Sequence, residues 1–148
     1  MGMSEALRLF ISNYTNFQGR SRRSEYWWVV LAVAVVFGVG GIIAMAIGGG
    51  FSSSGQLDLN PIGYLLLGIL GIAYLGIIIP MIALMVRRFH DLNQTGWLVL
   101  VFFVLGLIPL VSFFSGIGQL IWFCMPGTAG PNKYGEDPKG GVDVGAFD

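Results

Sequence analysis

The sequence has little charge, and long apolar stretches contain none. Only 11% of the 148 residues are Asp, Glu, Lys or Arg, and no charged residue occurs within residues 62–86 or 97–125. Such stretches cannot form the charged surface of a soluble domain, whereas the hydrocarbon of a bilayer solvates them directly. With 55% hydrophobic residues and a mean hydropathy of +0.75, the chain is predicted to be a small multi-span membrane protein.

Cysteine and histidine are also scarce, which limits the chemistry that the chain can perform. The lone Cys124 excludes an intrachain disulfide and a Cys-cluster metal site, and His90 is the only histidine. No Gly-x-Ser-x-Gly, His-Glu-x-x-His or Walker motif occurs. We therefore predict no catalytic residues, no metal site and no cofactor. Because the first apolar run begins only at Tyr26 and two more follow, we also expect a complete chain without a removed signal peptide.

The apolar blocks indicate three transmembrane helices, at about residues 27–47, 62–86 and 97–124. About twenty helical residues cross a hydrocarbon core of ~30 Å, and the first two blocks fit this length. Before them, Leu7, Phe10, Ile11 and Tyr14 have the i, i+3, i+4, i+7 spacing of a short amphipathic helix. We expect that helix to lie in the headgroup region or to pack on the other loops at that surface.

The third block has two interpretations. At 28 residues it fits one span bent at Pro109, whereas two crossings would leave each too short. Positive-inside counting favours two crossings, because a hairpin would put all eight Lys and Arg on one side. We let length decide and expect a single bent span. The fold prediction is an all-α membrane domain over residues 1–139, with a disordered tail at 140–148.

Small residues mark faces where helices can approach one another closely. In the first two spans they fall at helical spacing, on Gly40, Ala44 and Gly48 and on Gly68 and Gly76. Such small-xxx-small patterns allow close backbone contact between membrane helices. We expect packing within the chain, with homo-oligomerisation as the alternative.

Polar chemistry gathers in two short segments that flank the first two spans, and the second, residues 87–97, is predicted to be a membrane-surface loop. The candidate cluster consists of Arg20, Arg23, Glu25, Arg87, Arg88, His90 and Asp91. In one interpretation these residues bind an anionic lipid headgroup or ligand, because arginines grip phosphate and histidine titrates near neutrality. In the other, Arg23 or Arg87 pairs with Glu25 or Asp91 and clamps two loops together.

Four motifs occur in order along residues 5–139. They are Gly19-Arg20-x-x-Arg23-x-Glu25-Tyr26-Trp27, Arg87-Arg88-x-His90-Asp91 running into Gly96-Trp97, Ile108-Pro109, and Pro131-Asn132-x-Tyr134-Gly135-x-Asp137-Pro138. In these motifs the chain resembles the YhaH/YhaI-like family of bacterial inner-membrane proteins, domain of unknown function 805. The resemblance implies a small multi-pass inner-membrane protein and carries no catalytic roles. The longer third block and the Gly/Ser-rich first loop depart from the family pattern.

The preferred functional prediction is a non-enzymatic structural or interaction protein of the bacterial inner membrane. Its N-terminus is expected in the cytoplasm, because basic residues precede the first span. Its expected partners are the bilayer with its anionic headgroups, and a second copy of the chain, but not nucleic acid. An oligomeric channel or small-solute transporter, lined by Ser112, Ser115 and Gln119, is the alternative. An enzyme acting on headgroups through His90 is the third and weakest hypothesis.

Overall fold

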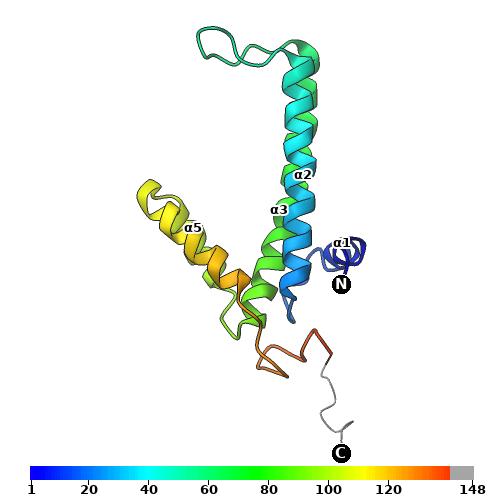
Figure 1. The fold of residues 1–148 in the computed structure, drawn as a ribbon, viewed down its shortest axis with the longest axis vertical. Helices are drawn as coiled ribbons and strands as arrows, with labels where there is room; N and C mark the ends of the chain where they lie inside the picture. The colour runs from blue at the N-terminus through cyan, green and yellow to red at the C-terminus, as the bar shows by residue number, and fades with distance from the viewer. Residues whose placement is uncertain (141–148) are drawn as a thin grey trace, which may run out of the picture.

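The computed structural model describes residues 1–140, which form five helices and no β-sheet. The helices are α1 (Met3–Ser12), α2 (Arg23–Gly48), α3 (Pro61–Asp91), α4 (Leu98–Gly106) and α5 (Pro109–Cys124). Figure 1 shows α2 and α3 as a long pair, with α1 across the end of the pair and α5 diverging from it. The predicted tail at 140–148 lies outside the described residues except for Gly140.

The long pair provides the two helices that can cross a membrane. α2 and α3 have 26 and 31 residues and are apolar enough for a span, and both exceed the ~30 Å hydrocarbon core at 1.5 Å per residue. Pro61 starts α3 at its first helical position, where the side chain of Asn60 accepts a hydrogen bond from the Gly63 amide at 2.9 Å. α3 continues to Asp91, so residues 87–91, predicted to be a loop, are helical. This extension holds the charged side chains of 87–91 in a fixed helical register.

Small residues allow α2 and α3 to pack closely toward the loop that joins them, away from the charged end. Ala44 is fully buried, and a Cβ atom on Gly40 would lie 2.9 Å from a methyl carbon of Leu70. A Cβ atom on Gly63 would lie 2.7 Å from the Cα atom of Gly48, which is closer than real side chains allow. The two backbones therefore touch at the Gly48–Gly63 crossing, and no larger residue fits there.

Gly68 and Gly76, the other two predicted packing positions, make no such close contact between α2 and α3. A Cβ atom on Gly68 would meet no heavy atom within 4 Å. Gly76 lies beside the turn that follows α1, because the hydroxyl of Tyr14 donates a hydrogen bond to its carbonyl. A Cβ atom on Gly76 would lie 4.0 Å from that hydroxyl, an ordinary contact distance.

The prediction of a single bent third span was wrong. The chain reverses between α4 and α5, and the returning helix packs beside the outgoing one, with the rings of Phe102 and Trp122 6.0 Å apart. The turn leaves few backbone groups unpaired, since Leu107 and Ile108 donate to carbonyls of α4 and Ser112 donates back to Ile108. The length argument considered only full crossings, whereas a hairpin that is paired internally need not cross. Pro109 begins α5, so the break falls where the bend was expected.

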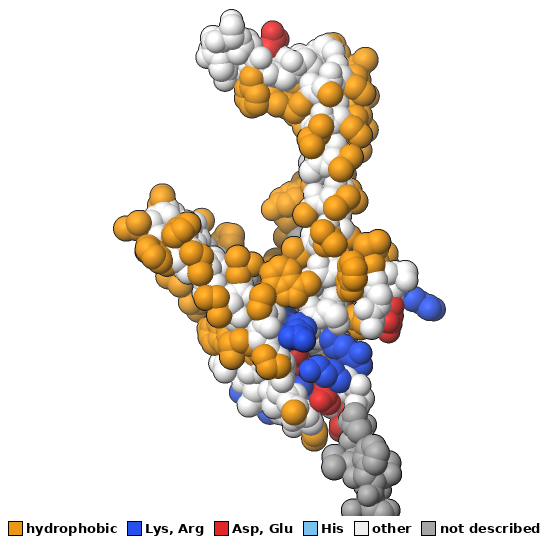
Figure 2. All heavy atoms as spheres, in the orientation of Figure 1, with side chains coloured by type: hydrophobic (Ala, Val, Ile, Leu, Met, Phe, Trp, Pro, Cys, Tyr) orange, Lys and Arg blue, Asp and Glu red, His pale blue; other side chains and the backbone are white. Residues whose placement is uncertain are grey.

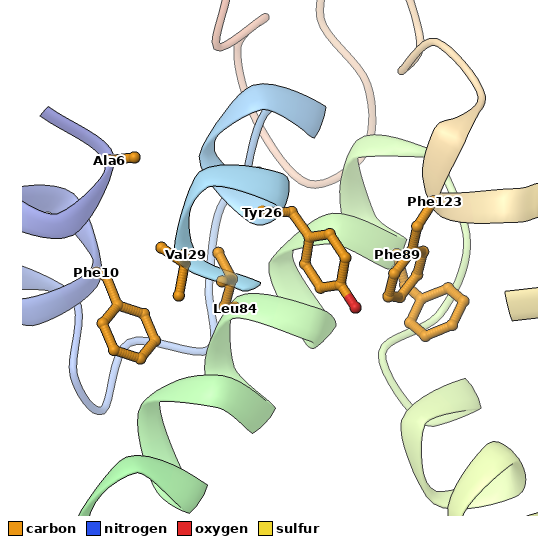
Figure 3. Close-up of a cluster of buried hydrophobic side chains, with 7 residues drawn as sticks. All are labelled: Ala6, Phe10, Tyr26, Val29, Leu84, Phe89 and Phe123. Carbon is orange, nitrogen blue, oxygen red and sulfur yellow. The ribbon is translucent and has the colours of Figure 1, made fainter. Parts of the chain in front are cut away.

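A small hydrophobic core joins four helices at one end of the molecule. It comprises Ala6, Phe10, Tyr26, Val29, Leu84, Phe89 and Phe123, drawn in Figure 3. Elsewhere large apolar side chains remain exposed, with Ile42 at 69% and Ile72 at 74%. Figure 2 shows these apolar side chains along the long pair and the hairpin, and the Lys and Arg side chains gathered at the core end. This division is what a bilayer around the helices and water at the charged end would produce.

Candidate functional site

The charged cluster is buried at the end of the helix pair where the core lies. Its members Arg20, Glu25, Arg87, Arg88 and Asp91 are each at most 9% exposed. They come from the loop before α2, the first turn of α2 and the end of α3. Three guanidinium groups and two carboxylates taken out of water need close partners, because an unpaired buried charge is strongly destabilising.

Asp91 is the centre of the cluster. Its Oδ1 atom lies 3.0 Å from Nη2 and 3.1 Å from Nε of Arg20, and its Oδ2 atom pairs with Arg88. The side chain of Asp91 is 4% exposed. Gly127 presses against this carboxylate so closely that a Cβ atom there would collide with it. Arg20 and Arg88, separated in the chain by α2 and most of α3, therefore share one acid.

Arg20 also binds the chain that follows α5, here called the C-terminal segment (residues 126–140). Its Nη1 atom donates to the Gly130 carbonyl at 2.6 Å, and its Nη2 atom donates to the Thr128 carbonyl. The Thr128 amide in turn donates to the Asp91 carbonyl at 2.8 Å. The guanidinium group thus links the loop before α2, the end of α3 and the C-terminal segment.

Arg88 makes an equivalent connection to the end of α5. Its Nη2 atom donates to the carbonyls of Phe123 at 3.1 Å and Met125 at 2.5 Å. These are terminal carbonyls of a helix, which carry partial negative charge and lack partners within the helix. They help to balance the positive charge that remains when three arginines face two carboxylates.

Arg87 and Glu25 form a second buried ion pair. The Nη1 atom of Arg87 lies 3.2 Å from Oε1 of Glu25, and both side chains are 5% exposed. The Ser21 amide donates to the Arg87 carbonyl at 3.1 Å, which adds a backbone link between the same segments. Two other atoms of Arg87, Nε and Nη2, are buried without a hydrogen-bond partner. Such an orphaned charged group calls for a water or a ligand.

His90 occupies a packing position beside the ion pairs. Its Nδ1 atom lies 3.1 Å from the Gly19 carbonyl, so that nitrogen carries the hydrogen, and its ring stacks on Tyr134 at 3.9 Å between centroids. The Asn132 side chain donates to the His90 carbonyl at 2.9 Å. The predicted histidine is thus held by the N-terminal loop and the C-terminal segment together.

Arg23 stands apart from the other predicted members. It is exposed and takes part in none of the ion pairs found within residues 1–140. The neighbouring Arg22 instead donates from Nε to the Pro138 carbonyl of the C-terminal segment. Within the same range, no three His, Cys, Asp or Glu residues are grouped so that they could hold a metal ion.

The C-terminal segment is folded by its own hydrogen bonds. Asp137 accepts from the Lys139 amide at 2.9 Å and from the Gly130 amide at 3.0 Å. These two bonds stabilise the carboxylate and hold the pKa of Asp137 below its ordinary value. The segment therefore presents its carbonyls to Arg20 from a closed turn.

Comparison with known proteins identifies the family. The family described as Protein of unknown function (DUF805) matches residues 14–136. The chain belongs to the DUF805 family. It is 35% identical to Inner membrane protein YhaI of Escherichia coli K12 over 131 residues, covering 88% of this chain and 92% of the relative. It is 31% identical to YhaH of the same strain over 129 residues, covering 87% and 92%. No solved structure matches the chain.

These relatives confirm the family predicted from the four motifs and place this DUF805 protein in the bacterial inner membrane. The family match ends at residue 136, inside the C-terminal segment. The matched region thus contains the buried arginines together with Thr128 and Gly130, whose carbonyls Arg20 binds.

An apolar cleft separates α3 from the hairpin in this DUF805 protein. Its volume is about 1010 Å³, and its walls include Ile82, Leu100 and Phe103, with Gln119 among the few polar groups. The Gln119 amide lies 3.6 Å from the Met85 sulfur. The cleft is mainly a hydrophobic surface between helices.

Sequence reasoning missed the C-terminal contacts of the DUF805 cluster. Asn132 and Tyr134 belong to the fourth motif, but nothing in their spacing indicated that they contact His90. Arg22 was not among the predicted cluster residues, although it donates to the Pro138 carbonyl. The one available signal was the co-occurrence of this polar motif with the arginine motifs in one family pattern.

Proposed function

We propose that this DUF805 protein is a non-enzymatic inner-membrane protein whose buried cluster ties its surface segments into one platform. The platform binds lipid headgroups or a partner protein at the cytoplasmic face. The observations that carry this proposal are the hydrogen bonds and ion pairs of Arg20 and Arg88. Apart from Nε of Arg88, which has no partner, their nitrogens donate to Asp91 and to backbone carbonyls of α5 and the C-terminal segment, so both guanidinium groups are engaged in holding the protein together.

The cytoplasmic orientation is supported by the distribution of positive charge. All eight Lys and Arg precede α2, start it, end α3 or follow α5. These positions share one end of the helix pair, because Arg20 and Arg22 contact the C-terminal segment, which carries Lys133 and Lys139. Positive residues are retained in the cytoplasm, so this end faces inward. Exposed Arg8 and Arg23 can meet anionic headgroups there.

The clamp is tested by limited trypsin digestion of the protein in detergent or nanodiscs. Arg20→Gln should expose the C-terminal segment, so that cleavage after Lys133 and Lys139 becomes faster. Arg8→Gln is the matched control, because Arg8 is an exposed arginine of α1. Equal cleavage rates in Arg20→Gln and the control would refute the clamp.

Orientation is tested separately by labelling a single cysteine. Lys139→Cys, in a chain with Cys124→Ala, should react with a membrane-impermeant maleimide only after the inner membrane is opened. Labelling in intact spheroplasts would contradict the cytoplasmic assignment. Loss of anionic-lipid binding in Arg23→Gln, with an unchanged unfolding midpoint, is the result expected for headgroup contact.

The alternative of a channel or small-solute transporter has less support. Ser112 and Ser115 donate to carbonyls of their own helix, at 2.7 and 3.2 Å, so their hydroxyls are not free to line a polar path. Gln119 lies in a cleft that is mainly apolar. Solute flux in reconstituted vesicles that is lost in Gln119→Leu is the observation that would favour transport.

A further inference from the structure

A second hollow, distinct from the apolar cleft, lies between α1 and the charged cluster. Its volume is about 350 Å³, and polar side chains contribute much of its wall. α1 contributes Glu5, the loop before α2 contributes Arg22, and the cluster contributes Glu25 and Arg87. We refer to it as the α1 pocket. Its volume falls within the range of small-molecule sites, at the lower end.

The α1 pocket contains hydrogen-bonding capacity that the described chain does not use. Arg87 forms part of the wall, but it is 4% exposed and its unpartnered Nε and Nη2 atoms have almost no accessible surface, so it contributes positive charge rather than free donors. Arg22 uses its Nε atom on the Pro138 carbonyl, and no partner is found for its two terminal nitrogens within residues 1–140. Guanidinium groups with adjacent free donors suit the oxygens of a phosphate or carboxylate.

The same pocket also contains acids, and they decide the class of ligand. Glu5 is exposed and forms no ion pair within the described chain, and Glu25 uses only Oε1 on Arg87. Because Glu25 is paired with Arg87, Glu5 is the acid that would repel a simple anion, and the arginines would repel a simple cation. A ligand that carries both charges a few bonds apart satisfies both sets.

The geometry points to a zwitterionic ligand, a phosphate diester joined to a primary ammonium group, as in glycerophosphoethanolamine. Arg22 would hold the phosphate through its two terminal nitrogens, with the positive charge of Arg87 beside it, and Glu5 would accept from the ammonium. This inference rests on the proposed function, because the charged cluster of the platform forms one wall of the pocket. It names the class of lipid headgroup that the platform binds. Glu25, in the pocket wall, directly precedes Tyr26 and Trp27 at the start of α2, and aromatic residues at the start of a span lie among lipid headgroups.

The test measures lipid retention by native mass spectrometry, after extraction from membranes with equal amounts of three lipids. Phosphatidylethanolamine should be retained about tenfold over phosphatidylglycerol, which lacks the ammonium, and over phosphatidylcholine, whose quaternary nitrogen cannot donate. Glu5→Gln should remove this preference, whereas Glu136→Gln, an exposed acid outside the pocket, should retain it. Equal retention of all three lipids, a preference for phosphatidylglycerol, or equal behaviour of the two variants would overturn the inference.

A soluble arm distinguishes the source of the ligand. Glycerophosphoethanolamine should compete with the lipid if the headgroup alone is recognised, and retention of the lipid without competition would assign the site to the membrane form. Both results support the same chemistry. Failure of the proposed platform would be distinguished from failure of this inference. It would appear as unchanged trypsin cleavage in Arg20→Gln, a measurement that needs no lipid.

Discussion

Replacing Asp91 by asparagine removes a negative charge that two buried guanidinium groups share. The change keeps the volume of the side chain but leaves Arg20 and Arg88 with carbonyl partners only. Removing one partner of a buried ion pair costs about 3–5 kcal/mol, because the remaining charge stays out of water. Solvent screening reduces this cost little, because the side chains of Arg20, Arg88 and Asp91 are at most 4% exposed.

Unfolding of Asp91→Asn in mild detergent, followed by circular dichroism during denaturant titration, measures this loss. The matched control is Asp58→Asn, because Asp58 is exposed in the loop between α2 and α3 and is in no ion pair of the described residues. We expect the control to lie within about 0.5 kcal/mol of the parent protein. If Asp91→Asn unfolds at the same denaturant concentration as the control, the cluster does not stabilise the fold in the way argued above.

Three further predictions concern other parts of the structure. In a double-mutant cycle, Arg87→Met and Glu25→Gln should each lower the free energy of unfolding. The double variant should lose less than the sum of the two single losses, by about 1 kcal/mol or more; additive losses would mean that the pair is not coupled. Gly63→Ala should lower the unfolding midpoint, by about 1–3 kcal/mol in free energy, because α2 must move away, whereas Gly68→Ala, in open space, should be neutral or slightly stabilising. Because the pKa of Asp137 is lowered from 3.8 on folding, its contribution is complete above that value and is lost as the pH falls through the folded pKa. Amide exchange in the C-terminal segment should therefore stay constant from neutral pH to about pH 5 once corrected for intrinsic rates, and rise only in stronger acid; a rise near pH 6 would contradict this assignment.

The sequence was informative wherever a local pattern decides the structure. Helical spacing of apolar residues predicted α1, and uninterrupted hydrophobic length predicted α2 and most of α3. Segregation of charge predicted which residues would gather at the membrane surface. Of those residues, the structure brings five into ion pairs, whereas His90 packs beside them and Arg23 remains exposed.

The sequence was uninformative where a choice depends on contacts between distant segments. Residues 97–124 satisfy the length rule as one span, but aromatic contacts such as Phe89 with Phe102 and Phe123 hold both arms of a hairpin against α3. The partners of Arg20 are mostly backbone carbonyls, which every residue has. No residue type or spacing marks a carbonyl as a ligand, so this part of the cluster could be found only in three dimensions.

The distance along the chain between Arg20 and its carbonyl partners also sets an order for biogenesis. Gly130 is made 110 residues after Arg20, which at about 5–20 residues per second is a delay of roughly 5–20 s. Both long helices are synthesised during that interval, and until it ends interfacial water must solvate the guanidinium groups. Completion of the last residues thus permits final closure, and a prematurely terminated chain would leave its arginines open to quality-control proteases.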